Sequence, residues 1–289
     1  MKKKITTKKM IATILLSLLM LIVTQIISQG LASSLYILGV PLFICNALAG
    51  ILYIGLIYIA AKFLCSKVLK YQTNDFNIMK PKVNIKWIMI GILLPIIVCS
   101  VYLLFNGNFV SSGKETSEIF AIITGAIFFT GLGAGIVEEI VFRGFIMNAL
   151  SMRFNKTIAI IVPSLLFGVA HTIGMDFDFR SCALVLVAGT LVGVMFSLIT
   201  IETKSIWNSA FVHALWNIVM IGGVLSIGNA VDEYSIYTYV IGSKSFMITG
   251  GDFGIESSVI SVIAYAIVSL IAFRAIKNKI KTQEELQQS

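Results

Sequence analysis

Eight long apolar stretches dominate this sequence and restrict what it can fold into. A helix needs about 20 apolar residues to cross a bilayer, and most of the stretches reach that length. The predicted spans are Met10–Gln29, Leu42–Leu64, Trp87–Phe105, Ile119–Leu150, Thr157–His171, Cys182–Thr200, Ile206–Ile227 and Ile255–Ala275. The fifth is short. The fourth would reach about 48 Å as a straight helix, beyond a hydrocarbon core of about 30 Å, so we expect it to tilt or bend.

The composition supports a membrane protein. Only 12% of the residues are charged and 57% are hydrophobic, and the mean hydropathy is +0.94. A soluble domain carries about 25% charged residues, so the composition excludes a soluble enzyme, a disordered chain and a disulfide-stapled secreted domain. We therefore predict an all-α, polytopic membrane helix bundle in which residues 1–289 form a single integral membrane domain.

The basic residues predict how the spans are oriented. With the N-terminus placed in the cytoplasm, only Lys114, Arg180 and Lys244 fall in outside loops, and Arg143 lies inside a span. All the others of the 22 basic residues lie on the inside, as the positive-inside rule requires when both termini are cytoplasmic. The net charge of +8 is then explained by topology and anionic lipid, which argues against a nucleic-acid partner. The Lys- and Ile-rich composition favours a multi-pass protein of a bacterial plasma membrane.

A few ionisable and amide side chains lie inside the predicted spans, where they are costly. An ionisable residue at the centre of a span costs about 2.5–3.5 kcal/mol on insertion scales and is usually functional. These polar residues fall in the fourth span, at the end of the fifth and in the seventh, and include both histidines of the chain: Glu138, Glu139, Arg143, His171, His213 and Asn217. They are the candidate site residues.

Helical spacing predicts how these side chains are arranged. Glu139 and Arg143 are four residues apart on one helix face and are expected to form an ion pair. Glu138 lies about 100° further round the helix and lacks a local partner. Because buried polar groups require partners, we expect Glu138 to share a polar cavity with the two histidines and Asn217.

Two pairs of glycines predict close helix packing. Gly131 and Gly135, and likewise Gly189 and Gly193, have the Gly-x-x-x-Gly spacing that lets helices approach closely in membranes. The run from Gly131 to Gly135 lies inside an apolar span with no strand before it, so it is not expected to bind a dinucleotide.

The polar residues form three motifs that resemble those of a known family. The motifs lie in order on successive apolar helices: Glu138-Glu139-x-x-x-Arg143, Phe167-x-x-x-His171 and His213-x-x-x-Asn217. They resemble the motifs of the CPBP family, the CAAX-prenyl-protease-like or Abi intramembrane endopeptidases. The resemblance covers residues 119–227, which we take as the catalytic core. It implies hydrolysis of a peptide bond in a membrane-associated protein or peptide.

The resemblance also implies a role for each of four residues. Glu138 is expected to act as the general base that activates water. His171 would help to hold that water, and His213 and Asn217 would stabilise the oxyanion. A glutamate-type mechanism of this kind needs no cofactor.

A supporting pair and a metal alternative complete the expectations for the site. Glu139 and Arg143 are expected to orient their helix. If zinc is bound instead, its ligands would be Glu138, His171 and His213, with a water in the open position. The HExxH pattern of zinc proteases is absent from the sequence, which favours the mechanism without a metal.

Two functions of other classes stay open at the level of sequence. Buried carboxylates and histidines also form proton relays, so a proton-coupled transporter is one alternative. The other is a non-enzymatic bacteriocin-immunity or regulatory membrane protein. Substrate identity and oligomeric state leave no signal in the sequence.

The predicted depths of the site residues conflict. Glu138 and His213 lie nearer the cytoplasmic ends of their spans, whereas His171 lies at the outside end of the fifth. Either the fifth helix is misplaced or the site lies deep in the membrane. We favour a misplaced fifth helix, with residues 172–179 extending it or re-entering the membrane. The outside loop Gly228–Phe253 is expected to lie on the membrane surface or to cap the site.

Overall fold

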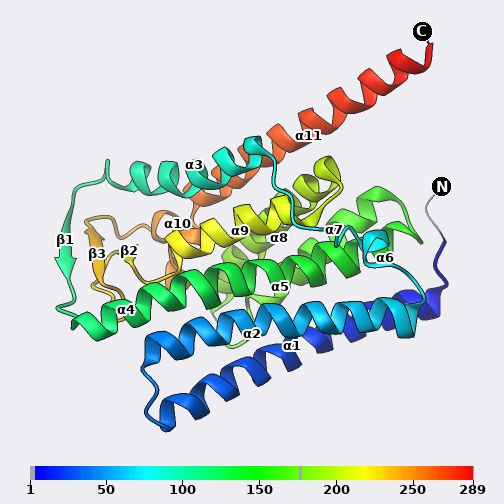
Figure 1. Cartoon of the computed structure of the whole chain (residues 1–289). Coiled ribbons are helices and arrows are strands. Elements are labelled where there is room, and N and C mark those ends of the chain that lie inside the picture. The colour runs from blue at the N-terminus through cyan, green and yellow to red at the C-terminus, as the bar shows by residue number, and fades with distance from the viewer. Residues whose placement is uncertain (1–3, 176–177, 289) are drawn as a thin grey trace.

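The computed structural model describes residues 4–175 and 178–288 and consists mainly of long helices (Figure 1). Each of the eight predicted spans contains a helix. Outside the fourth span, the long helices are α1 (Thr7–Ile37), α2 (Leu42–Phe63), α3 (Ile85–Tyr102), α7 (Lys156–Ala170), α8 (Phe179–Thr203), α9 (Ile206–Met220) and α11 (Val259–Gln288). Short turns of helix connect them: η1 (Leu64–Leu69), η2 (Thr73–Phe76), α10 (Phe246–Thr249), η5 (Gly251–Phe253) and η6 (Ile255–Ser257).

Only some of these helices are long enough to cross a membrane. Among the described residues, six helices are long and apolar enough to cross a membrane. The other two predicted spans, α7 and α9, have 15 residues each, about 22 Å at 1.5 Å per residue. The polytopic membrane bundle is therefore confirmed, with two of its eight helices shorter than the bilayer is thick.

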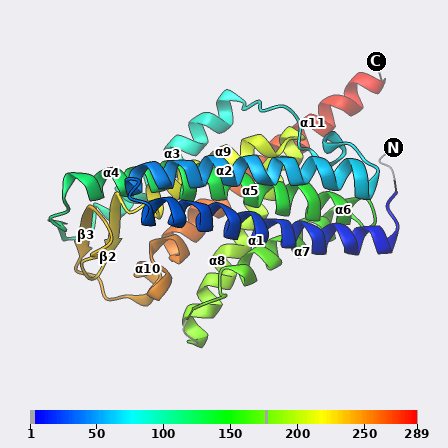
Figure 2. The same cartoon turned by 60° about the horizontal axis from the view of Figure 1, so that its bottom comes forward.

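The two ends of the chain lie at the same end of the bundle (Figure 1). Seen from a second direction, α8 extends away from the neighbouring helices (Figure 2). Termini at one end agree with an even number of crossings. That this end faces the cytoplasm stays a prediction from the basic residues.

The fourth span is a single continuous helix with two widened stretches. It runs from Thr116 to Ser151. Its segments are α4 (Thr116–Thr124), the π-helical η3 (Gly125–Ala134), α5 (Gly135–Glu139), the π-helical η4 (Ile140–Ile146) and α6 (Met147–Ser151). π-Helical turns occur frequently at functional sites, and here they flank the turn that carries the two adjacent glutamates.

The seventh predicted span is wrong at its C-terminal end. The helix ends at Met220 rather than at Ile227. Gly223 has φ +75°, which a residue with a side chain rarely adopts, so the chain turns away here. The eighth span is also shifted, because its helix begins at Val259 rather than Ile255.

A small β-sheet, which the all-α prediction did not include, lies at one end of the helix bundle (Figure 1). β1 (Gly107–Ser111) pairs antiparallel with β3 (Tyr237–Ile241), and β3 pairs parallel with β2 (Leu225–Gly228). The predicted outside loop Gly228–Phe253 thus supplies β3 and α10. Its last residue, Phe253, lines the cavity that also contains Glu138 and both histidines. Part of this loop therefore covers the predicted site.

The glycine pairs lie where helices approach closely, as predicted. A Cβ atom added at Gly189 would lie 2.8 Å from the Cα of Gly168, so α7 and α8 touch through two glycines. At Gly135 an added Cβ would lie 2.9 Å from the backbone nitrogen of Ala214 on α9. These contacts hold three functional helices at short distances from one another.

Replacing Gly189 by Ala is expected to destabilise the protein by about 1–3 kcal/mol, because the added methyl group overpacks the α7–α8 contact. The measurement is reversible unfolding in mixed detergent micelles. Gly55 is the matched control, since nothing lies within 4 Å of an added Cβ at this exposed position of α2. Gly55→Ala should leave stability unchanged or raise it by about 1 kcal/mol. Equal effects of the two changes would contradict the close contact.

Candidate active site

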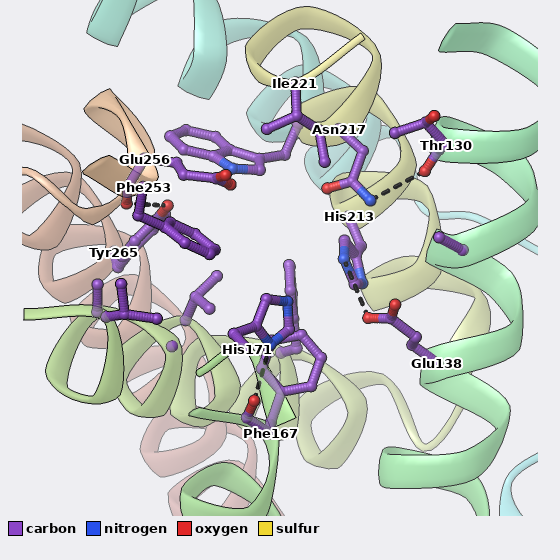
Figure 3. A pocket seen from close by; sticks show the side chains of 17 residues that line it. Thr130, Glu138, Phe167, His171, His213, Asn217, Ile221, Phe253, Glu256 and Tyr265 are labelled. Carbon is purple, nitrogen blue, oxygen red and sulfur yellow. Dashed lines mark hydrogen bonds and ion pairs between the residues drawn. The ribbon is translucent and has the colours of Figure 1, made fainter. Parts of the chain in front are cut away.

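Three helices bring the predicted site residues to one cavity of about 160 Å³ (Figure 3). Glu138 comes from α5, His171 directly follows α7, and His213 and Asn217 lie one turn apart on α9. All four side chains line the cavity. Its volume accommodates several water molecules.

The pair between Glu139 and Arg143 is present and is completely buried. Nη1 of Arg143 lies 2.7 Å from Oε1 of Glu139, and both side chains are 0% exposed. Neither residue lines the cavity. A buried ion pair is stabilised by further hydrogen bonds to its charges. Arg143 has one, to Gly193, whereas its Nε and Oε2 of Glu139 have none among the described residues.

Arg143 connects α7 and α8 to the helix that carries the glutamates. Its Nη2 donates a hydrogen bond to the carbonyl of Gly193 on α8, 3.1 Å away. The guanidinium also lies over the rings of Phe167, at 4.6 Å from the centroid, and Phe196, at 5.2 Å. Such cation–π contacts strengthen when they are shielded from water.

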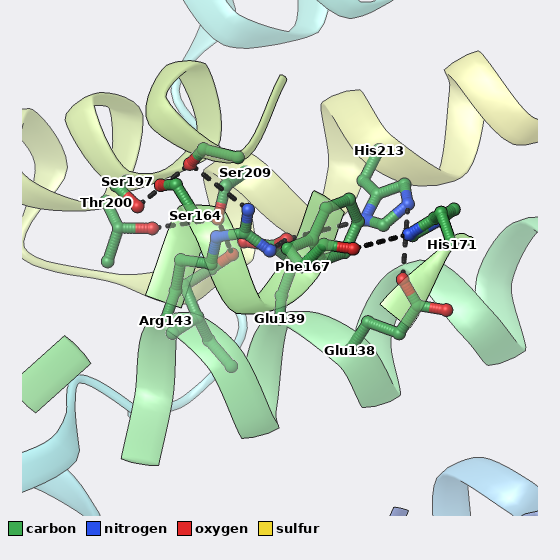
Figure 4. A network of polar contacts seen from close by, with 12 residues as sticks. Glu138, Glu139, Arg143, Ser164, Phe167, His171, Ser197, Thr200, Ser209 and His213 are labelled. Carbon is green, nitrogen blue, oxygen red and sulfur yellow. Dashed lines mark hydrogen bonds and ion pairs between the residues drawn. The ribbon is translucent and has the colours of Figure 1, made fainter. Parts of the chain in front are cut away.

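His213 lies between the two glutamates (Figure 4). Its Nδ1 is 3.4 Å from Oε1 of Glu139, and its Nε2 is 3.8 Å from Oε2 of Glu138. The imidazole stacks on the ring of Phe196 with centroids 4.6 Å apart. The adjacent glutamates therefore face different ways: Glu139 contacts Arg143 and His213 in the interior, while Glu138 reaches the cavity.

His171 is oriented by its own helix. Its Nδ1 lies 2.8 Å from the carbonyl oxygen of Phe167, one turn earlier (Figure 3). A carbonyl oxygen can only accept, so Nδ1 carries the hydrogen in this contact. In the neutral ring, Nε2 is then an acceptor.

Asn217 is held by the fourth span. Its Nδ2 donates a hydrogen bond to the carbonyl of Thr130, 3.0 Å away. The side-chain amide has two N–H groups, so one stays available beside the cavity.

Glu138 is the polar group of the site with the fewest partners. Its side chain is 24% exposed. Its Oε2 is buried and has no hydrogen-bond partner among the described residues. Its ionisable neighbour is the imidazole of His213, whose Nε2 lies beyond hydrogen-bond distance at 3.8 Å from Oε2.

The conflict over depth is resolved by the length of α7. The prediction that the fifth helix is misplaced is wrong, because its bounds, Lys156–Ala170, agree with the predicted span within one residue. The side chain of Asn155 caps its first turn by accepting from the backbone N–H of Ile158. A helix of about 22 Å ends before it crosses the bilayer, so His171 reaches the level of the other site residues. Residues 172–175 form turns and do not continue the helix; residues 176–177 lie outside the described part of the chain.

Sequence reasoning missed several residues that line the cavity. Phe253, Glu256 and Tyr265 form the wall opposite Glu138 (Figure 3). Glu256 is the second residue of the predicted eighth span. A carboxylate at the end of a span is expected at the membrane surface, so it was not considered as a site residue. The structure places it instead in the same cavity as Glu138.

The described residues do not form a metal site. No three His, Cys, Asp or Glu side chains among them converge closely enough to hold a metal ion. The two ring nitrogens of His213 face two different carboxylates, and Nδ1 of His171 is engaged by a backbone carbonyl. The contact of His171 with the carbonyl leaves its Nε2 unengaged, so the zinc alternative with Glu138, His171 and His213 stays a prediction.

Two comparisons with known proteins bear on this site. Residues 119–219 match the family model described as type II CAAX prenyl endopeptidase Rce1-like. The chain is also 30% identical over 107 residues to the putative membrane peptidase YdiL of Bacillus subtilis. That alignment covers 37% of this chain and 40% of the Bacillus protein, so the similarity extends over less than half of either.

The matched segment coincides with the site. All six predicted site residues lie within it: Glu138, Glu139, Arg143, His171, His213 and Asn217. Outside the segment lie the first three helices and the last. The resemblance to the CPBP family is thus confirmed over residues 119–219, the segment that is similar to the Rce1-like CAAX endopeptidases.

Proposed function

We propose that this protein is an intramembrane endopeptidase that hydrolyses a peptide bond of a membrane-associated protein or peptide. The observation that carries the proposal is the convergence of Glu138, His171, His213 and Asn217 on one cavity. Hydrolysis requires a base, a held water and donors for the oxyanion, and these side chains supply all three. The family match over residues 119–219 supports the same reaction.

Glu138 acts as the general base in this proposal. Its side chain lines the cavity and is 24% exposed, so its carboxylate can accept from a water there. His171 accepts the second hydrogen of that water through Nε2, because its Nδ1–H is engaged by the carbonyl of Phe167. The water oxygen, held between two acceptors, attacks the carbonyl carbon while Glu138 takes its proton.

The negative charge then develops on the former carbonyl oxygen. The remaining N–H of Asn217 faces this charge, since the other is bonded to Thr130. With both nitrogens protonated, His213 donates Nδ1–H to Glu139, while Nε2–H, 3.8 Å from Oε2 of Glu138, is the second donor of the site. Glu138 finally passes its proton to the leaving nitrogen as the C–N bond breaks, which gives a carboxylic acid and an amine and regenerates the ionised base.

Glu139 and Arg143 support the reaction without touching the substrate. Their buried pair fixes the turn between the two π-helical stretches, and Glu139 orients His213. The proposal requires no metal, since each step is carried by a named side chain.

The direct test uses the purified full-length protein in lipid nanodiscs with membrane-tethered reporter peptides. We expect internal cleavage, identified by the masses of both products, at a rate that a membrane-permeant chelator leaves unchanged. A protein that only transports or confers immunity would leave every peptide intact. Activity that disappears with the chelator and returns with zinc would overturn the mechanism without a metal.

A further inference from the structure

The wall of the cavity opposite Glu138 contains a second carboxylate that the proposed reaction does not use. Glu256 lies in η6, just before the spanning helix α11, and lines the cavity together with Phe253 and Tyr265 (Figure 3). The phenol of Tyr265 donates a hydrogen bond to the backbone carbonyl of Glu256, 2.9 Å away. This bond fixes the backbone from which the carboxylate projects.

No basic side chain balances Glu256 in the part of the chain that the structure describes. The ion pairs found there involve other carboxylates. The side-chain hydrogen bond to Glu256 comes from Trp216, an uncharged donor. The pKa of the Glu256 carboxyl is raised to about 7, mainly by burial; the Trp216 hydrogen bond lowers this pKa and the charge of Glu138 raises it. A carboxylate in this position gains from any cation that enters the cavity.

Aromatic rings surround the same position. Trp216 and Tyr265 pack edge to face with centroids 5.0 Å apart, and both line the cavity. Phe253 completes this side and contacts the ring of His171, with centroids 6.1 Å apart. Aromatic faces attract cations, and more strongly where water is excluded. A carboxylate among aromatic rings is suited to the head group of lysine or arginine and repels a free carboxylate.

We propose that Glu256, Trp216, Phe253 and Tyr265 form a subsite that binds a lysine or arginine side chain of the substrate close to the scissile bond. This inference rests on the proposed endopeptidase function and adds a substrate class to it: membrane-associated peptides with a basic residue beside the cleavage site. Glu256 is a specificity-determining residue here, because it contacts the substrate side chain and not the reacting atoms. The subsite also disfavours a substrate whose free C-terminal carboxylate would lie there.

The test compares membrane-tethered peptides that carry Lys, Met or Glu at each position around the cleavage site. For the wild-type protein we expect one position at which Lys gives a kcat/KM at least about tenfold above Met, with Glu below both. Glu256→Gln should lose the preference for Lys, because its kcat/KM for the Lys peptide should fall to that for the Met peptide. Glu233→Gln is the matched control, since Glu233 is exposed in the loop before β3 and does not line the cavity; it should keep the preference.

A binding measurement separates this inference from the proposed function. In the Glu138→Gln background, the fluorescence anisotropy of a labelled Lys peptide should report at least about tenfold tighter binding than that of its Met counterpart, and adding Glu256→Gln should remove the difference. Equal binding of the two peptides, or a Lys preference that survives Glu256→Gln, would overturn the subsite. A wild-type protein that cleaves no peptide would overturn the endopeptidase function, while the binding result still decides about the subsite.

Discussion

Replacing Glu138 by Gln should lower kcat for the cleavage of a membrane-tethered peptide by about 10²–10⁴-fold, the range that general acid–base catalysis supplies. The amide keeps the shape of the side chain but cannot take a proton from water. The chain contains another glutamate one residue away, yet Glu139 cannot substitute, because it is 0% exposed and bonded to Arg143.

The same substitution should leave the protein at least as stable as the wild type. Glu138 forms no ion pair with Arg143, and its Oε2 has no hydrogen-bond partner among the described residues. Burying an amide costs less than burying a carboxylate, so the unfolding transition in mixed micelles should not fall. A purely structural role would predict the reverse, namely lower stability with cleavage retained.

Glu118→Gln provides the control for the removal of one negative charge from the same span. Glu118 is exposed in the first turn of α4 and pairs with the half-buried Lys114 at 3.5 Å, away from the cavity. It should cleave at the wild-type rate. Cleavage at the full wild-type rate by Glu138→Gln would rule out this residue as the base.

The positions of the long helices along the chain could be predicted from the sequence, because long apolar runs mark them. The six helices that cross the membrane by length were each found from apolar runs. The ends of the seventh and eighth spans were predicted wrongly, because apolar residues also occur in β2 and η6. Hydropathy does not distinguish a strand or turn packed on the bundle from the last turns of a helix.

The site could be predicted in part for a related reason. Polar side chains inside apolar helices are conspicuous, and Glu138, His171 and His213 do line one cavity. Helical spacing gave the Glu139–Arg143 pair directly. Glu256 was missed because its place in the cavity depends on the path of the chain before α11, which no local pattern encodes.

Removing the charge of Arg143 should have the largest effect on folding. Arg143→Met leaves the carboxylate of Glu139 buried at 0% exposure with only the His213 imidazole, at 3.4 Å, beside it. Breaking a buried ion pair on one side costs about 3–5 kcal/mol. The substitution also removes the hydrogen bond to Gly193 and the contact with the ring of Phe167. Reversible unfolding in mixed micelles measures the loss.

Two further variants test whether the loss of stability comes from leaving the carboxylate of Glu139 buried without its partner. In the double variant Glu139→Leu with Arg143→Met, no buried charge is left alone, and most of the stability should return, because apolar replacements of buried ion pairs are often neutral. Lys114→Met breaks the pair with Glu118, which is partly exposed to solvent, and should cost less than about 1 kcal/mol. If the double variant were as unstable as Arg143→Met alone, the loss would lie in the packing of Arg143 against α7 and α8 rather than in the charge of Glu139.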